Sequence, residues 1–318
     1  MIFAMVVIGG LTRLTESGLS MVEWRPVTGW LPPLSDAAWQ EEFGKYQTFP
    51  QYQLVNQGMS LDDFKNIYWP EYLHRLMGRV IGLVFALPLI WFASTRRLPS
   101  GLTLKLSGIF ALGAAQGALG WFMVRSGLVN TPAVSHYRLV AHLGLAILLY
   151  GLILSTAWGV AAPRSAKSWQ PVGLAVVSVI YFQILMGGLV AGLDAGQIHN
   201  TWPSMDGAFL PIAAFDLEPL WRNFLDNPSM VQFEHRMLGY LASLAVAGFA
   251  VSLRAGAGDP SRRRLGSILL AALIVQMGLG IATVLQGAPA GIAALHQTGA
   301  LVLLTVALLA ARRRVAGG

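Results

Sequence analysis

The sequence predicts an all-α, polytopic membrane protein in which eight transmembrane helices form two pseudo-symmetric four-helix bundles. Three observations lead to this prediction. Of the 318 residues, 55% are hydrophobic and only 12% are charged, about half the charge of a typical soluble domain. Long apolar tracts alternate with short basic loops, as in helical membrane proteins. The chain also repeats several motifs in the same order, which indicates an internal duplication.

Seven apolar segments are close to the roughly 20 residues needed to cross a bilayer. They are 76–95, 103–124, 138–160, 171–192, 236–253, 265–286 and 292–311. Residues 1–12 form a shorter apolar segment, which we take as the first of eight spans, and we expect further protein upstream of Met1. A protein of seven spans with an outer N-terminus is the alternative, and it leaves every loop on the same side.

The loops between these segments fall into two sets by charge. One set is basic and contains Arg96, Arg97, Lys105, Arg164, Lys167, Arg254, Arg262 to Arg264 and Arg312 to Arg314. The alternate set is not basic and consists of 13–73, 125–137, 193–234 and 287–291. The positive-inside rule therefore places the basic loops and both termini on the cytoplasmic side of the membrane. The net charge of +7 is explained by this asymmetry, so no nucleic-acid partner is expected.

Three ordered pairs of motifs define the repeat. The pairs are IGGLTRLTESG at 8–18 with GGLVAGLDAG at 187–196, HRLMGR at 74–79 with HRMLGY at 235–240, and QGALGWFMV at 116–124 with QMGLGIATV at 276–284. We therefore predict an N-terminal half, 1–160, and a C-terminal half, 171–311. Four spans in each half bring both halves into the membrane from the same side, which argues against a transporter built from inverted repeats.

Each predicted half contains a pair of histidines at the outer ends of its spans. The first pair is His74 and His142, and the second is His235 and His296. The chain has no cysteine, which excludes disulfides, iron–sulfur clusters and covalent c-type heme attachment. Two imidazoles that face each other across a bundle suit the axial positions of a heme iron. We therefore predict two heme sites near the periplasmic face.

Three arginines accompany these histidines and are predicted to pair with heme propionates. They are Arg75, Arg79 and Arg236, and arginine is the preferred bidentate partner of a carboxylate. The alternative is that they are ordinary arginines of the membrane interface. His136 and His199 are expected to be surface or loop residues and not ligands.

The two halves differ beside the first histidine of each pair. Glu71, three residues before His74, corresponds to Gln232 before His235, and Glu71 shares a helix face with His74. Because Glu71 follows Pro70, it is expected in the first turn of its helix. The carboxylate predicts acid–base or oxidative chemistry in the first half, with a structural or electron-transfer heme in the second. A glutamate that merely begins a helix is the alternative.

Several tracts together resemble the heme A synthase family, in particular its cysteine-free branch found in alphaproteobacteria and mitochondria. They are GGLTRLTESGLSMVEWRPVTGWLPPL, EYLHRLMGR, NTWPSMDG, FEHRMLGY and ALHQTGA. The resemblance covers nearly the whole chain. The departures are the short first span and a histidine at position 199, where the family usually has an aromatic residue.

The resemblance implies an enzyme that oxidises a ring methyl of heme O to the formyl group of heme A by two hydroxylations, for use in cytochrome c oxidase. It implies that His74 and His142 flank the substrate heme, that His235 and His296 ligate a permanent heme b, and that Glu71 is catalytic. Heme O synthase, oxidase assembly factors, an unidentified electron donor and a second copy of the chain are the candidate partners. The alternative function is a di-heme b-type cytochrome that transfers electrons from quinol.

Overall fold

The computed structural model describes residues 1–99, 101–129, 131–161, 167–255 and 259–314. The chain divides into two compact units, Met1–Leu152 and Ile153–Gly318. Among the described residues, seven helices are long and apolar enough to cross a membrane, and they coincide with the seven clear spans that the sequence predicts. The protein is therefore a multi-pass membrane protein. Helix α1 (Ile2–Leu14) is apolar but shorter, so an eighth span is not confirmed.

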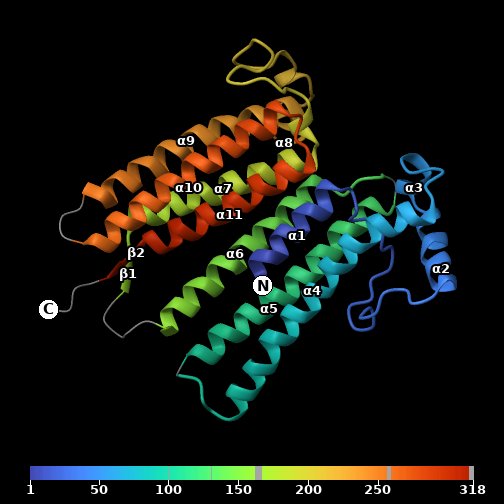
Figure 1. The fold of residues 1–318 in the computed structure, drawn as a ribbon, viewed down its shortest axis with the longest axis horizontal. Coiled ribbons are helices and arrows are strands. Elements are labelled where there is room, and N and C mark those ends of the chain that lie inside the picture. The colour runs from blue at the N-terminus through green and yellow to red at the C-terminus, as the bar shows by residue number, and fades with distance from the viewer. Residues whose placement is uncertain (100, 130, 162–166, 256–258, 315–318) are drawn as a thin grey trace. The chain divides into compact units, whose positions relative to one another are not determined.

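The first unit is built from α1 and three long helices. These are α4 (Leu61–Ser94), α5 (Leu102–Gly127) and α6 (His136–Ala161), whose last residues belong to the second unit. Helix α1 packs against α4, and α4 packs against α5 (Figure 1). None of the residues in the most apolar window of α4 is buried inside the protein. A bilayer accepts such an apolar surface without the cost that water would impose.

The start of α4 differs from the sequence prediction. The helix begins at Leu61, well before the predicted start near residue 76, because Ser60 and Asp63 form a capping box that satisfies its first backbone N–H groups. Pro70 lies inside the helix, so the expectation that Glu71 occupies a first turn is wrong. The predicted outer loop 13–73 is also partly helical and contains α2 (Asp36–Gln47) and α3 (Pro50–Leu54).

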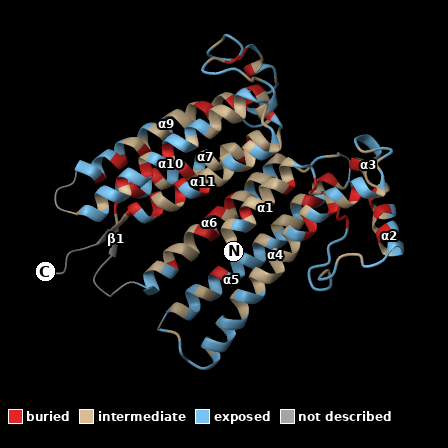
Figure 2. Cartoon of the chain, viewed as in Figure 1, coloured by how far each residue is buried: buried red, intermediate tan, exposed pale blue. Residues whose placement is uncertain are grey.

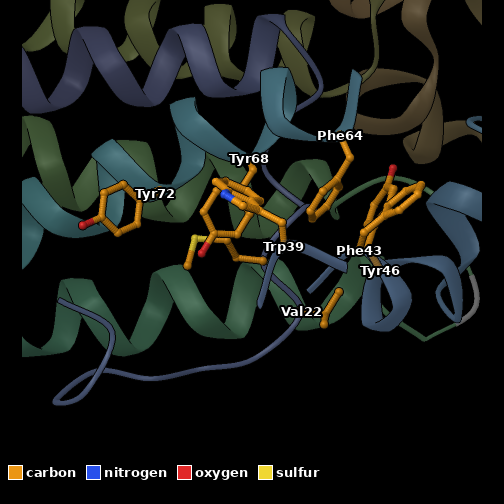
Figure 3. Close-up of a cluster of buried hydrophobic side chains, with 8 residues drawn as sticks. Val22, Trp39, Phe43, Tyr46, Phe64, Tyr68 and Tyr72 are labelled. Atoms are coloured by element: carbon orange, nitrogen blue, oxygen red, sulfur yellow. The ribbon is translucent and has the colours of Figure 1, made fainter. Parts of the chain in front are cut away.

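An aromatic cluster attaches α2 to the first turns of α4 (Figure 3). The ring of Trp39 lies 5.0 Å from that of Tyr68 at an angle of 74°, and Phe43 lies 5.1 Å from Phe64. Fully burying one such side chain contributes about 1.5–3 kcal/mol, and aromatic pairs add to this. The cluster thus holds the part of α4 that leads directly into Glu71 and His74.

The second unit is a bundle of four long helices (Figure 1). They are α7 (Pro171–Gly192), α9 (Pro228–Ala255), α10 (Pro260–Leu285) and α11 (Ala290–Ala310). Figure 2 shows buried residues along these helices, and Leu253, Leu269 and Leu301 are almost completely buried. The segment between α7 and α9 contains three short 3-10 helices, Ala195–Gln197, Ile212–Phe215 and Leu220–Arg222, and helix α8 (Asn223–Asp226).

A short ladder modifies the prediction of an all-α fold. Strands β1 (Lys167–Trp169) and β2 (Arg312–Arg314) pair antiparallel, with Trp169 opposite Arg312. Both segments lie beside the ends of long helices, where backbone groups no longer have helical partners and pair with each other instead. The two strands were predicted as basic loops. The rest of the described secondary structure is helical.

Candidate functional site

The four predicted ligands lie on four different helices. His74 is on α4 and His142 on α6, whereas His235 is on α9 and His296 on α11. The structure brings the second pair together, with ring centroids 6.5 Å apart and planes at 87°. Metal–imidazole bonds of about 2 Å place the centroids of two rings on opposite sides of one ion about 6 Å apart. The second-unit pair therefore has the separation that bis-histidine ligation requires.

Each of these histidines is seated on a glycine of a neighbouring helix. The pairs are Gly9 of α1 with His74, Gly120 of α5 with His142, Gly187 of α7 with His235, and Gly280 of α10 with His296. A Cβ atom added to the glycine would lie 2.8 Å from the imidazole Cε1 in three pairs and 3.3 Å in the Gly187 pair. Separations below 3.0 Å essentially never occur for real Cβ atoms. The absence of a side chain at these positions therefore allows the rings to occupy the interior of each unit.

Three of the histidines also contact a glutamine one helical turn before the seating glycine. The glutamine Nε2 donates to the histidine backbone carbonyl at 2.9 Å in Gln116–His142, and at 3.0 Å in Gln183–His235 and Gln276–His296. Residues four apart lie on one helix face, so one face supplies both contacts. The corresponding residue on α1, four positions before Gly9, is Met5.

Glu71 is buried and accepts hydrogen bonds on both carboxylate oxygens. Its Oε2 accepts from Ser20 Oγ at 2.7 Å and from the backbone N–H of Met21 at 2.8 Å. Its Oε1 accepts from Arg75 Nε at 3.0 Å and Nη2 at 2.5 Å. Arg75 also donates to the carbonyls of Met21 and Glu23. Glu71 and Arg75 together hold the segment 20–23 against α4, and the carboxylate neutralises the guanidinium.

We call the contacts of Arg75 and Glu71 with the segment 20–23 a clamp. The second unit has a corresponding clamp, in which an arginine and a glutamine hold the segment and no carboxylate takes part. Arg236 donates to the carbonyls of His199, Thr201 and Ser204, and Gln232 donates to His199. Arg236 is buried, its Nε has no hydrogen-bond partner, and its hydrogen bonds among the described residues all go to backbone carbonyls. The carboxylate of Asp206 interacts with its charge but is not hydrogen-bonded to it. The clamp of the second unit therefore has a positive charge with no carboxylate bonded to it, and such a charge can bind an anionic ligand.

A cavity of about 400 Å³ lies beside Arg236. Its lining is mostly apolar and includes Trp202, Phe209, Met237 and Tyr240. Apolar walls with one cationic side chain at the edge fit a flat macrocycle that carries carboxylates. In the first unit, Arg79 donates to the carbonyls of Arg25 and Pro26, and its Nη1 is buried without a partner.

His136 and His199, which the sequence does not predict as ligands, lie elsewhere. The ring of His136 packs against that of Tyr137. His199 lies 2.6 Å from Asp206 through Nδ1 and 3.0 Å from Ser229 through Nε2, and its hydrogen bond lowers the pKa of Asp206. His199 thus ties the loop after α7 to the first turn of α9.

The roles of the glutamines and the seating glycines were not predicted from the sequence. The signal is a Q-x-x-x-G pattern that occurs at 116–120, 183–187 and 276–280, with M-x-x-x-G at 5–9. Two of these tracts are part of the repeat. Glycine is common in transmembrane helices, however, so the pattern by itself does not indicate a contact with histidine. Only the packing shows that these residues contact histidines.

The residues present fit heme in the second unit on three observations. The imidazole pair has the required separation, the rings lie in space kept open by glycines, and Arg236, which is hydrogen-bonded to no carboxylate, lines a largely apolar cavity that the two histidines do not line. In the first unit, His74 and His142 are likewise seated on glycines, and the Nδ1 of each is buried without a hydrogen-bond partner.

A family model described as "Cytochrome oxidase assembly protein" matches residues 1–308. A protein named heme A synthase from Nitrosospira multiformis is 48% identical over 315 residues, covering 97% of this chain and 88% of the relative. Heme A synthases of Parvibaculum lavamentivorans and Sinorhizobium fredii are 48% and 49% identical, covering 97% and 96% of this chain and 89% and 85% of the relatives.

No solved structure gives a significant match to the chain. The family model spans nearly the whole sequence, and the relatives align over almost the same length. The chain therefore belongs to the cytochrome oxidase assembly protein family, within which its similar relatives are heme A synthases.

Proposed function

We propose that the protein is a heme A synthase, which oxidises a ring methyl of heme O to a formyl group and supplies heme A to cytochrome c oxidase. The similarity to heme A synthases over almost the whole chain carries this proposal. The chemistry suits the fold, because a prenylated heme is lipid-soluble and its enzyme belongs in the bilayer. These relatives are not quinol-oxidising cytochromes, so the alternative function is not supported.

The second unit is proposed to hold a resident heme b. His235 and His296 would ligate its iron, and Arg236 would bind a propionate. The free charge of Arg236 supports this, because the corresponding Arg75 is already neutralised by Glu71. When bound, the heme supplies one-electron redox chemistry, while the protein supplies ligation, orientation and charge.

The first unit is proposed to bind heme O between His74 and His142, with Arg75 and Arg79 beside it. Glu71 is proposed to take up a proton during the oxidation. Glu71 accepts four hydrogen bonds, and a carboxylate has about four acceptor sites. One of these hydrogen bonds must therefore be released before the carboxylate can take up a proton. The Ser20 hydroxyl also lies 3.2 Å from the carbonyl of Ile67. By donating to that carbonyl instead, Ser20 would leave only the N–H of Met21 on Glu71 Oε2, which could then hold the proton and donate it to the Ser20 oxygen.

The two units are proposed to be the products of a duplication, each with one heme site near the periplasmic face and both termini in the cytoplasm. Matching contacts support this. Arg75 and Arg236 bond the carbonyls of Met21 and His199, respectively, which occupy corresponding positions in the two motifs. An electron donor, heme O synthase and oxidase assembly factors are the proposed partners, and a homo-oligomer is the proposed assembly.

The proposal is tested by expressing the chain with a source of heme O and identifying the hemes extracted from membranes. The unaltered chain should yield heme A together with heme b. A Glu71→Ala variant should retain heme b and lose heme A, whereas Gln232→Ala should still form heme A. Two molecules of heme b and no heme A from the unaltered chain would refute the synthase. Normal heme A from Glu71→Ala would refute the role of Glu71.

A further inference from the structure

We propose that the residue one turn before each seating glycine determines how firmly the opposing histidine is held. Gln183 and Gln276 fix both ligands of the resident heme, whereas Met5 leaves His74 as the ligand that releases the iron when the first-unit heme is exchanged. This inference rests on the proposed heme sites. It adds that glutamines anchor the ligands of the resident heme whereas Met5 does not anchor His74, which the proposed function alone does not require.

In the second unit a glutamine amide holds the backbone carbonyl of each histidine. Nε2 of Gln183 lies 3.0 Å from the carbonyl of His235, and Nε2 of Gln276 lies 3.0 Å from the carbonyl of His296. Each Nε2 also lies 3.1 Å from the ring Nδ1 of its histidine. Because a histidine that ligates iron through Nε2 carries its proton on Nδ1, the amide N–H donates to the carbonyl and only packs against the ring. Each glutamine therefore anchors the helix that presents the histidine and lies against its ring.

In the first unit only one histidine is held in this way. Gln116 donates to the carbonyl of His142 at 2.9 Å and lies 3.4 Å from its Nε2. His74 has no such contact at its carbonyl among the described residues, and the Nδ1 of both first-unit histidines is buried without a partner. The thioether of Met5 cannot donate a hydrogen bond and is a weak acceptor.

Met5 occupies the same place relative to α4 that Gln183 occupies relative to α9. A Cβ added at Gly78 would lie 3.4 Å from Met5 Cε, and one added at Gly239 would lie 3.2 Å from Gln183 Nε2. Gly78 and Gly239 each lie four residues after the histidine. The side chains of Met5 and Gln183 thus lie beside corresponding glycines. They differ in that only the glutamine can donate a hydrogen bond.

This difference fits the two tasks of the protein. A resident heme must stay bound through many turnovers, so both of its ligands benefit from preorganisation. A substrate heme must enter and its product must leave, which requires that at least one axial bond opens. His74 is seated by Gly9, but no glutamine amide is bonded to its backbone carbonyl. It is therefore the histidine whose bond to the iron is best suited to break.

The test compares variants at the Met5 and Gln276 positions in the full-length, heme-loaded protein. Met5→Gln is nearly isosteric and adds the amide, Met5→Leu is the apolar control, and Gln276→Met removes an amide from the resident site. Transfer of each heme to excess apomyoglobin is followed, with extracted hemes identified at each time. The ferrous protein is also titrated with carbon monoxide, which binds only iron that has lost an axial ligand.

Met5→Gln should slow the release of the first-unit heme about fivefold to tenfold, the factor given by one net hydrogen bond, and should reduce carbon monoxide binding. Met5→Leu should behave as the unaltered chain, and Gln276→Met should speed the loss of heme b by a similar factor. The spectrum of heme b in the Met5 variants reports that they are folded.

The outcomes separate this inference from the proposed function. If two hemes bind but Met5→Gln releases the first-unit heme at the unaltered rate, or Gln276→Met retains heme b as the unaltered chain does, the inference is wrong and the synthase stands. If the unaltered chain binds no heme in the first unit, both are wrong.

Discussion

At the residue scale, the difference between Glu71 and Gln232 changes the charge of two otherwise similar clamps. Both arginines bond the carbonyls of the segment that follows the first helix of their unit. In the first unit the guanidinium is paired with Glu71, whereas Arg236 has only neutral acceptors among the described residues. The difference between Glu71 and Gln232 thus gives one unit a buried ion pair, and the other a buried cation that is hydrogen-bonded to no carboxylate and interacts with Asp206 only through charge.

The ring geometry of the second pair predicts a spectroscopic signature. The planes of His235 and His296 lie at 87°, and perpendicular axial imidazoles leave two iron d orbitals nearly equal in energy. The ferric resident heme should therefore give a highly anisotropic low-spin signal in electron paramagnetic resonance. The measurement is made on the Glu71→Ala variant without a heme O source, so that only heme b contributes. A rhombic signal, typical of parallel rings, would contradict the observed geometry.

The seating glycines predict a graded loss of heme. Gly280→Ala places a Cβ 2.8 Å from His296, whereas Gly187→Ala places one 3.3 Å from His235. Gly280→Ala should therefore displace its histidine and abolish most heme b binding, and Gly187→Ala should have a smaller effect. Gly278→Ala, on the same helix with no atom within 4 Å, is the control. Heme b per chain in the purified protein is the measurement, and equal losses in Gly278→Ala and Gly280→Ala would exclude the seating role.

The four histidines could be singled out in the sequence because they recur in matching motifs beside apolar segments, and their role as ligands stays a prediction. The glycines and glutamines could not, because their role depends on which helix faces meet. Met5 shows this most clearly, since a methionine in an apolar helix has no feature that separates it from its neighbours. Its meaning comes only from the amides at the equivalent positions on α5, α7 and α10.

At the element scale, α4 shows how local capping outweighs a proline. The sequence suggests that Pro70 begins the helix, but the capping box of Ser60 and Asp63 starts it at Leu61, and the aromatic cluster holds the added turns against α2. The added turns are amphipathic rather than apolar, so a search for membrane-spanning hydrophobicity misses them. As a result, Glu71 lies inside α4, with helical turns both before and after it.

Removal of the cap should weaken this helix start. Ser60→Ala loses the bond to the N–H of Asp63, and such losses cost about 0.5–2 kcal/mol. The variant should unfold at a lower temperature, whereas Ser60→Thr, which retains a hydroxyl, should stay close to the unaltered protein. Thermal unfolding of the detergent-solubilised protein measures this. An unchanged midpoint for Ser60→Ala would mean that the aromatic cluster alone holds the first turns.

At the scale of the whole molecule, the seven long spans could be predicted because each is a continuous apolar segment of membrane-crossing length. The short first helix is different. Its 13 residues extend about 20 Å at 1.5 Å per residue, less than a bilayer core of about 30 Å. Yet α1 supplies Gly9 to His74 and Met5 to the neighbouring Gly78, so this element lies against the predicted site whether or not it crosses the membrane.

The direction of the spans can be tested directly because the chain contains no cysteine, so one introduced cysteine is the only thiol. The positive-inside rule places the segments 13–73 and 193–234 outside and the arginine-rich start of α10 inside. Leu34 and Ile212 are highly exposed in the first two segments, and Ser261 is exposed at the third. A membrane-impermeant maleimide should label Leu34→Cys and Ile212→Cys in cells whose outer membrane has been opened. Ser261→Cys should react only after the inner membrane is also disrupted. The opposite pattern would invert the topology and place both heme sites toward the cytoplasm.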